Sequence, residues 1–311
     1  MTRRELLQLL AYVSGAMCCA PLSMALAAAI PGKTTKLITR TVPARGTALD
    51  VLPVIGLGSW ITFNVGGDAA GRANALEVMR EFLACGGRLI DSSPMYGSAQ
   101  SVIGAALARL GNPKVLFAAD KVWTRADGAK QIEQSRTNWG IARFDLLQVH
   151  NLTDWERKLP LLLEMRAAGT VRFVGITTSE GRRHAEMERV MRTHPIDFVQ
   201  LTYNIRDREA EHVLLPLAAD RGIAVIANRP FQQGALIDWA KRQPLPSWSQ
   251  EIDCTNWAQF LLKFIVSHPA VTCAIPATSQ ASHVRENMGA ARGRLPDAAF
   301  RRRMIAYVES L

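Results

Sequence analysis

The sequence predicts an α/β protein with a (β/α)8 barrel, and three observations lead to that fold class. The chain has 311 residues, which fits the roughly 250 residues of a single barrel domain preceded by a short leader. From about residue 54, short apolar segments rich in β-branched residues alternate with longer segments of helical period, as in repeated βα units. Eight such units follow one another, and eight parallel strands with eight crossovers can close a barrel.

Each predicted unit begins with a strand segment that is rich in Val, Ile and Leu. The predicted strands are Val54–Trp60, Arg88–Ser93, Val115–Val122, Asp145–His150, Val171–Thr178, Asp197–Asn204, Ile223–Asn228 and Val271–Thr278. Helices are predicted near residues 71–85, 98–110, 127–139, 156–168, 181–193, 209–220, 256–267 and 281–291. Glycines such as Gly169 and Gly222 stand between helix and strand segments, where the chain must turn.

An open, doubly wound sheet is the alternative architecture, and it usually carries a three-glycine fingerprint after its first strand. Here the first strand ends in Gly56-Leu-Gly-Ser-Trp60, which has no third glycine. The barrel is therefore favoured.

Three segments surround or interrupt the repeated units. Residues 37–42 and 48–51 flank a turn at Gly46 and predict an N-terminal β-hairpin over one end of the barrel. Residues 296–311 predict a C-terminal helix. The segment 232–253 is the longest irregular connection, and it belongs to the seventh unit, over the face that carries active sites in barrels.

Residues 1–29 have the order of an export signal. Arg3 and Arg4 precede an apolar run from Leu6 to about Ala29 that ends in small residues, and the paired arginines resemble the twin-arginine signal that exports folded proteins. We therefore expect an export signal peptide at 1–29, read by export machinery, and a single barrel at 30–311 in the bacterial periplasm. An uncleaved N-terminal segment that anchors the protein in a membrane is the alternative.

The net charge of +10 raises the question of a nucleic-acid partner. The basic residues are distributed, however, and the densest group, Arg292, Arg294 and Arg301–Arg303, flanks a terminal helix with few aromatic stacking partners. We therefore expect no nucleic-acid partner. Cys85, Cys254 and Cys273 lack the spacing of a zinc site or a disulfide framework, so no metal is expected.

Catalytic residues of such barrels lie at the C-terminal ends of strands or in the loops that follow. Asp91, Lys121 and His150 stand at the ends of predicted strands two, three and four, and Tyr96 follows Asp91 by five residues. A lysine buried in an apolar strand needs an acidic partner, which Asp91 on the adjacent strand supplies. A lysine cation lowers the pKa of a nearby phenol and favours phenolate character.

These four side chains predict proton transfer to or from a carbonyl through Tyr96, with His150 bonding the substrate oxygen. The set contains no electron source, so a reduction requires a cofactor that donates hydride.

The segments that carry these residues resemble the aldo-keto reductase family, in the same order and over essentially the whole barrel. The resemblance rests on Gly87-Arg-Leu-Ile-Asp-Ser-Ser-Pro-Met-Tyr-Gly-Ser98, Ile103-Gly-Ala-Ala-Leu107, Asp120-Lys-Val-Trp123, Leu147-Gln-Val-His-Asn151, Ile275-Pro-Ala-Thr278 and Glu286-Asn287. It implies an NAD(P)(H)-dependent oxidoreductase that interconverts a small-molecule aldehyde or ketone and an alcohol. The family's general acid/base corresponds to Tyr96, beside Asp91, Lys121 and His150.

The resemblance also implies cofactor contacts, with departures from the family pattern. Gln200 matches the glutamine that holds the nicotinamide carboxamide, whereas Asn228 stands where an aromatic residue commonly stacks on the nicotinamide. Ala277 and His283 replace a lysine and an arginine of many NADP-using members. NADP(H) is expected only because it is the usual cofactor of the family, and NAD(H) is the alternative. The candidate cofactor residues are Thr177, Thr178, Gln200, Asn228, Arg229, Thr278, His283, Glu286 and Asn287, with Arg285 as a substitute for the missing basic groups.

Aromatic residues near the strand ends predict an apolar mouth for the substrate: Trp60, Phe63, Trp123 and Phe231, with Trp239 as a further candidate. Two other functions stay open. Lys121 could form a Schiff base as a lyase does, although Asp91 argues against this by keeping the lysine protonated. A low-turnover cofactor-binding or regulatory barrel is the other, favoured by Asn228. An exported reductase would also need a retained cofactor or an external redox partner.

Overall fold

The computed structural model describes residues 36–43 and 51–311. The export signal expected at residues 1–29 lies outside these ranges and stays a prediction, as do the periplasmic location and the membrane-anchored alternative. Within the described ranges, no helix combines the length and the apolar character needed to cross a membrane.

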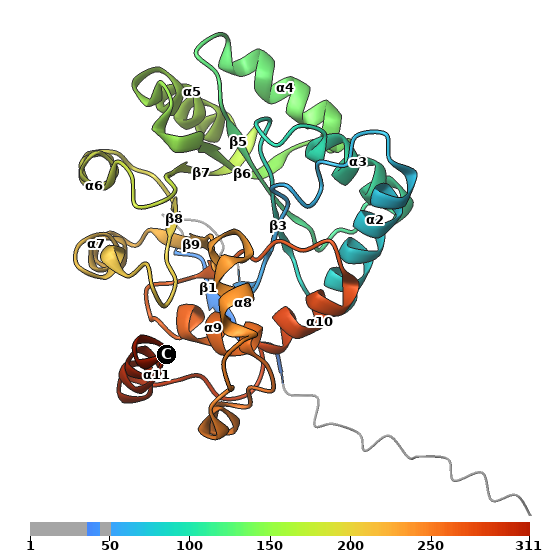
Figure 1. Ribbon diagram of the computed structural model, residues 1–311. Helices are drawn as coiled ribbons and strands as arrows, with labels where there is room; N and C mark the ends of the chain where they lie inside the picture. The colour runs from blue at the N-terminus through green and yellow to red at the C-terminus, as the bar shows by residue number, and fades with distance from the viewer. Residues whose placement is uncertain (1–35, 44–50) are drawn as a thin grey trace, which may run out of the picture. The chain divides into compact units, whose positions relative to one another are not determined.

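In this part of the chain, eight parallel strands form one sheet that curls into a barrel (Figure 1). Parallel bridges from Ile55 to Ala274 and from Gly58 to Ala277 join the first strand to the last. The predicted (β/α)8 barrel is confirmed, although its first and last strands are shorter than predicted. The strands are β3 (Leu57–Gly58), β4 (Leu89–Asp91), β5 (Phe117–Val122), β6 (Phe144–Val149), β7 (Val171–Thr177), β8 (Phe198–Thr202), β9 (Ala224–Asn228) and β10 (Cys273–Ala274).

Helices lie between successive strands, and two more follow the last strand (Figure 1). They are α2 (Ala69–Ala84), α3 (Ala99–Arg109), α4 (Gly128–Trp139), α5 (Trp155–Ala167), α6 (His184–Thr193), α7 (Leu214–Arg221), α8 (Ala235–Ala240), α9 (Trp257–Val266), α10 (Ala281–Gly289) and α11 (Ala298–Ser310). Short 3-10 helices are η1 (His150–Leu152), η2 (Glu209–Glu211), η3 (Gln232–Gly234) and η4 (Ser247–Ile252). The segment 232–253, predicted to be irregular, therefore contains η3, α8 and η4, while α11 is the predicted C-terminal helix.

Local sequence fixes where the helices begin and end. Asp127 caps α4, because its side chain accepts a hydrogen bond from the Lys130 N–H at 3.1 Å. Gly140 ends the same helix with a φ of 65°, and Gly222 ends α7 with a φ of 64°. Glycine adopts this left-handed conformation without the steric cost that a side chain would add.

The predicted N-terminal hairpin is present as the antiparallel pair β1 (Thr39–Thr41) and β2 (Val51–Pro53). Its turn at Gly46 lies outside the described residues. Val42 and Leu52 of this hairpin are fully buried, so the hairpin contributes directly to the hydrophobic core.

An inner apolar cluster fills the N-terminal end of the barrel. It combines Val42 and Leu52 with Phe117, Phe173 and Phe198, whose ring centroids are 5.5 to 6.1 Å apart. Phe117 and Phe198 are the first residues of β5 and β8. Because apolar rings occupy this end, the polar residues of the strands gather at the opposite, C-terminal end.

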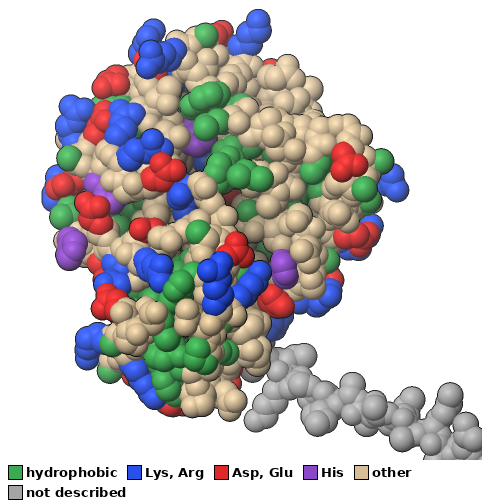
Figure 2. All heavy atoms as spheres, in the orientation of Figure 1, with side chains coloured by type: hydrophobic (Ala, Val, Ile, Leu, Met, Phe, Trp, Pro, Cys, Tyr) green, Lys and Arg blue, Asp and Glu red, His purple; other side chains and the backbone are tan. Residues whose placement is uncertain are grey.

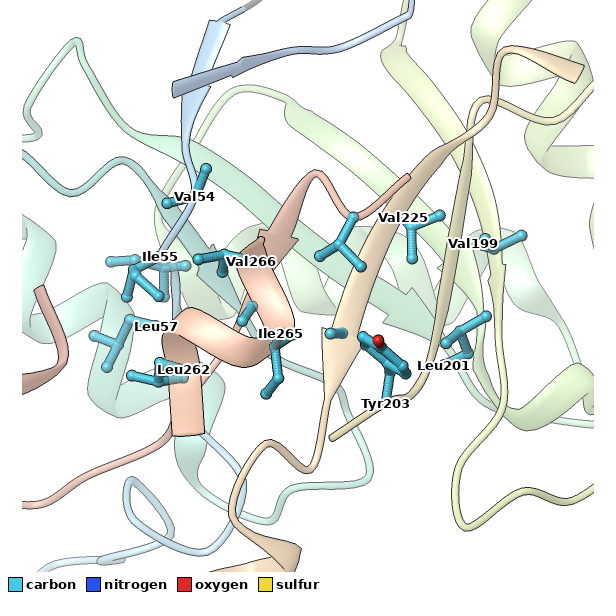
Figure 3. Packing of buried hydrophobic residues seen from close by; sticks show 14 of the residues in the cluster. Val54, Ile55, Leu57, Val199, Leu201, Tyr203, Val225, Leu262, Ile265 and Val266 are labelled. Carbon is cyan, nitrogen blue, oxygen red and sulfur yellow. The ribbon is translucent and has the colours of Figure 1, made fainter. Parts of the chain in front are cut away.

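A second, larger apolar cluster packs the strands against the surrounding helices. Figure 3 shows side chains of this cluster, among them Leu262 and Ile265 of α9 together with Val54 and Leu57 from the first strand region. Each fully buried Leu or Ile side chain contributes about 1.5 to 3 kcal/mol to folding. This packing holds the strand ends in fixed positions.

Basic side chains do not gather in a single patch on the face drawn in Figure 2, where they are spread out and mixed with acidic ones. In the C-terminal group, Arg301 pairs with Glu211 at 2.8 Å, and Arg303 pairs with Glu251 at 3.2 Å. Part of the basic charge therefore fixes α11 to the rest of the barrel.

Candidate active site

A cavity of about 370 Å³ opens at the C-terminal ends of the barrel strands. This is the end at which the catalytic residues were predicted. Predicted site residues that line the cavity are Asp91, Tyr96, His150, Thr177, Thr178, Gln200, Asn228, Arg229, Trp60 and Phe231. The structure therefore brings most of the predicted catalytic, cofactor and substrate residues to one place.

Lys121 and Asp91 form an ion pair inside the barrel. Lys121 Nζ lies 2.5 Å from Asp91 Oδ2, and the two side chains are 0% and 2% exposed. Gln200 Nε2 donates to the other carboxylate oxygen, Asp91 Oδ1, at 2.8 Å. Burial lowers the pKa of Lys121, but the charge and hydrogen bond of Asp91 together with the charges of Tyr96 and Asp120 outweigh it, so the pKa lies above its ordinary value. The lysine is therefore a cation at neutral pH.

Tyr96 lies between this cation and His150. Lys121 Nζ is 5.0 Å from the centroid of the Tyr96 ring, and the Tyr96 and His150 rings meet edge to face with centroids 5.6 Å apart. Burial raises the pKa of Tyr96, and this effect exceeds the lowering by Lys121. The predicted net lowering is therefore wrong in sign, because desolvation of the phenolate dominates. The phenol stays protonated and is able to donate its proton.

His150 follows β6 directly and is 5% exposed. Its Nδ1 lies 2.8 Å from Ser93 Oγ. Burial and the charge of Lys121 together hold the pKa of His150 well below its ordinary value, so the imidazole is neutral. The next residue, Asn151, has a φ of 52°, and its N–H donates to Thr177 Oγ1 at 2.9 Å. This turn fixes the backbone beside the ring.

The polar residues at the ends of β7 to β9 bond to one another across the cavity wall. Asn228 Oδ1 accepts from Thr202 Oγ1 at 2.8 Å, and Asn228 Nδ2 donates to the main-chain oxygen of Thr178 at 2.9 Å. The next residue, Arg229, pairs with Glu180 at 2.9 Å. Asn228 thus joins neighbouring strands through its amide, although it occupies the position where the family pattern has an aromatic ring.

Four predicted cofactor residues lie outside the cavity, at the end of β10 and in α10: Thr278, His283, Glu286 and Asn287. His283 and Glu286 are exposed, whereas Thr278 and Asn287 are buried. Thr278 Oγ1 and His283 Nδ1 are 3.4 Å apart. Arg285, expected to replace a missing basic group, pairs with Glu81 at 3.1 Å. These four residues therefore lie apart from the cavity that the candidate catalytic residues line.

Phe63 is not at the substrate mouth, so its prediction needs correction. Its ring is fully buried in the larger apolar cluster, which packs the strands against the helices. The chain turns sharply after β3, because Ile61 has a φ of 64° and the Phe63 N–H donates to the Ser59 carbonyl oxygen at 3.2 Å. This turn returns Phe63 to the core and leaves Ile61 on the cavity wall.

Trp123 and Trp239 also lie away from the cavity lining. Trp123 is 41% exposed, and its main-chain N–H donates to Gln131 Oε1 at 2.7 Å. Trp239 packs against Trp257, with ring centroids 6.0 Å apart, and lies under the guanidinium of Arg206. Trp123 directly follows β5 and Trp239 lies in α8, and neither side chain belongs to the cavity wall.

Asp120, next to Lys121 in β5, was missed as a functional candidate. It is fully buried, and its carboxylate accepts from Gln100 Nε2 at 2.8 Å and from the Lys121 N–H at 2.7 Å. Burial raises the pKa of Asp120 to about 7. The signal was visible in the sequence, because a carboxyl group inside an apolar strand is rare unless it has partners.

Sequence reasoning also missed Ser93, Glu180 and Arg182. Ser93 contacts His150, and the other two line the cavity, where Arg182 pairs with Glu180 at 2.6 Å. Ser93 is the last residue of the predicted second strand but lies two residues beyond the end of β4, and Glu180 and Arg182 lie in the loop between β7 and α6. In the described part of the chain, no three His, Cys, Asp or Glu side chains group to hold a metal ion, and Cys85, Cys254 and Cys273 are free thiols.

The fold and the site together define a (β/α)8 barrel with a cavity and a cluster of ionisable side chains at the C-terminal ends of its strands. The model of the aldo/keto reductase family matches residues 54–305. The chain therefore belongs to the aldo/keto reductase family, and the prediction of an oxidoreductase of that family is confirmed.

The chain is also similar to two named reductases and to a solved aldo/keto reductase structure. The chain is 26% identical over 245 residues to the methylglyoxal reductase YeaE of Escherichia coli, a match that covers 76% of this chain and 84% of the relative. An NADH-specific methylglyoxal reductase of E. coli is also 26% identical, over 235 residues, with 65% and 70% covered. A solved aldo/keto reductase from Klebsiella pneumoniae, in complex with NADP and acetate, matches with a TM-score of 0.71 and 23% identity, covering 88% of this chain and 95% of that one.

Proposed function

We propose that this protein is an NAD(P)(H)-dependent oxidoreductase that interconverts a small-molecule aldehyde or ketone and an alcohol, with Tyr96 as general acid/base. The observation that carries the proposal is the placement of Tyr96 between the buried Lys121–Asp91 pair and the neutral His150, on the wall of one cavity. This arrangement joins a proton donor, a fixed positive charge and a second hydrogen-bonding group.

The residues present fit a nicotinamide dinucleotide. The side-chain NH2 group of Gln200 donates to Asp91, so the side-chain oxygen of Gln200 is the atom that would accept a hydrogen bond from the amide of a nicotinamide. Arg182 and Arg229 line the same cavity and supply positive charge for phosphate groups. The bound cofactor supplies or accepts the hydride.

NADP(H) is the proposed cofactor, with NAD(H) as the alternative. The Klebsiella structure holds NADP, whereas one E. coli relative is described as NADH-specific. The exposed residues His283 and Glu286 of α10 do not distinguish the two cofactors. A comparison of kcat/KM with NADPH and with NADH distinguishes them.

In the direction of reduction, His150 donates a hydrogen bond to the carbonyl oxygen, and the Tyr96 hydroxyl transfers its proton to the same oxygen. Lys121 stabilises the phenolate that Tyr96 becomes, because a nearby cation favours the charged form of a phenol. Asp91 holds Lys121 charged and in place at 2.5 Å. Oxidation of an alcohol uses the same groups in reverse.

The Schiff-base alternative is disfavoured by the state of Lys121. An amine must lose its proton before it attacks a carbonyl, but the pKa of Lys121 lies above its ordinary value because of Asp91. The low-turnover alternative rested on Asn228. Its amide is engaged by Thr202 and Thr178, which accounts for an asparagine at this position without a regulatory role.

Tyr96→Phe tests the proposal. We expect kcat to fall by about 10²- to 10⁴-fold on an aldehyde panel that includes methylglyoxal, while the Kd of NADPH stays at the wild-type value. Cofactor absorbance follows turnover, and fluorescence titration follows binding. Tyr307→Phe is the matched control, because Tyr307 lies on α11 away from the cavity lining and its hydroxyl donates to the Pro244 carbonyl oxygen at 2.7 Å. Undiminished turnover of Tyr96→Phe would exclude the role given to Tyr96.

A further inference from the structure

The hydroxyl of Ser93 contacts Nδ1 of the His150 ring. Ser93 Oγ lies 2.8 Å from His150 Nδ1, and the two residues are 0% and 5% exposed. The Met95 N–H donates to the same Ser93 oxygen at 3.2 Å. Ser93 Oγ therefore accepts one hydrogen bond from the backbone, and its hydroxyl proton needs an acceptor.

The position of that proton follows from the partners of Ser93. Among the described residues, His150 Nδ1 is the acceptor found within reach of the Ser93 hydroxyl. A buried hydroxyl proton without an acceptor is destabilising, so Ser93 donates to Nδ1. A neutral imidazole has one protonated nitrogen and one acceptor nitrogen. If Nδ1 accepts, the proton of His150 is on Nε2.

The surroundings of His150 keep the ring in this orientation. Tyr96 meets the imidazole edge to face at 87°. The residue after His150, Asn151, is held by a hydrogen bond from its N–H to Thr177 Oγ1 at 2.9 Å. Since Nδ1 is directed at Ser93 and His150 lines the cavity, Nε2 is the nitrogen left for a ligand.

We propose that Ser93 is a positioning residue that holds His150 in its Nε2–H tautomer, so that Nε2–H donates to the carbonyl oxygen of the substrate. The other tautomer would turn a lone pair of Nε2 toward the lone pairs of that oxygen and lose the hydrogen bond. This inference rests on the proposed function, because it concerns how the same site binds a carbonyl.

The tautomer is measured without turnover, by ¹⁵N nuclear magnetic resonance of the histidine rings in the full-length, cofactor-free protein. His150→Gln identifies the His150 signals by their loss. We expect Nε2 to carry the proton and Nδ1 to be an unprotonated acceptor at neutral pH. A proton on Nδ1 overturns the inference, whether or not the protein reduces carbonyls.

Ser93→Ala tests the consequence for catalysis, and Ser92→Ala is the matched control. Ser92 is also fully buried, and in the described part of the chain its hydroxyl has no hydrogen-bond partner. We expect Ser93→Ala to lower kcat/KM by about tenfold, the order of one lost hydrogen bond to a reacting group. Ser92→Ala is expected to retain the wild-type value. Equal values for the two variants overturn the inference.

A double variant separates an effect through His150 from a general structural effect. If Ser93 acts through His150, then Ser93→Ala adds no further loss of kcat/KM when His150→Ala is already present. Additive losses overturn the inference. A wild-type protein that binds cofactor but reduces no carbonyl would instead contradict the proposed function, and the tautomer measurement would still decide the role of Ser93.

Discussion

The two halves of the cavity wall are built from different kinds of contact. At the ends of β4 to β6, Asp91 and Lys121 form a pair whose side chains are at most 2% exposed. At the ends of β7 to β9, the charged pair is Arg229 with Glu180, whose side chains are 22% and 41% exposed. Buried contacts hold the first half in one geometry before any ligand binds, whereas the second half contains contacts that a ligand can exchange.

The largest expected effect is on the free energy of unfolding, when Lys121→Met removes the buried ion pair between Lys121 and Asp91. Removing the cation leaves the Asp91 carboxylate buried without its counter-charge, which costs about 3 to 5 kcal/mol in the free energy of unfolding. Urea unfolding at neutral pH measures the loss. Turnover should fall as well, because Tyr96 loses the charge that stabilises its phenolate.

Lys241→Met is the control for that variant. Lys241 pairs with Asp238 at 3.5 Å on the surface, with side chains 68% and 69% exposed. Exposed pairs contribute about 0 to 1 kcal/mol, so its unfolding curve should nearly overlay that of the wild type. Equal losses for the two variants would remove the contrast between a buried and an exposed half.

A smaller effect is expected from Asp120→Asn, on the pH dependence of stability. Because the pKa of Asp120 is raised to about 7 in the folded state, the folded chain binds a proton that the unfolded chain releases nearer pH 4. Wild-type stability at this position therefore falls as the pH rises toward 7. Relative to the wild type, Asp120→Asn should gain about 2 kcal/mol between pH 5 and pH 8.

Urea unfolding of the wild type and of Asp120→Asn at both pH values gives this difference directly. Glu133→Gln, on the exposed surface of α4, is the control for loss of a carboxylate, and no such gain is expected from it. A constant difference between Asp120→Asn and the wild type at the two pH values would show that Asp120 is ionised throughout.

The smallest effect is expected on the Kd of NADPH, from Glu180→Gln in the half of the cavity wall at the ends of β7 to β9. Glu180 pairs with both Arg182 and Arg229, and its negative charge competes with the phosphates of a dinucleotide. Neutralising it should tighten NADPH binding by up to about fivefold, since an exposed pair is worth about 1 kcal/mol or less. Fluorescence titration at low and at high salt measures the Kd, and the gain should shrink at high salt.

Catalytic turnover with saturating NADPH separates Glu180→Gln from the buried-half variants. We expect kcat to stay at the wild-type level, because Glu180 contacts neither Tyr96 nor Lys121 in the described structure. Weaker binding of NADPH would contradict the idea that Glu180 competes with the cofactor.

The barrel and the positions of the candidate catalytic residues could be predicted because they depend on strand position. Alternation along a strand and the place where it ends put Asp91, Lys121 and His150 at one end of the sheet. Phe63 could not be placed in this way, since its direction depends on the positive φ of Ile61 in a tight turn. The pKa of Tyr96 was also beyond sequence reasoning, because its sign depends on how burial compares with one nearby charge.

The bridge between Gly58 and Ala277 sets the order in which a newly made chain can assemble. Both residues line the cavity, but the ribosome adds the second one only after most of the barrel has been synthesised. Until then, β3 and β9 present open sheet edges, which readily pair with other chains. A chain that stops before residue 271 would carry Asp91, Lys121 and His150 without a closed cavity.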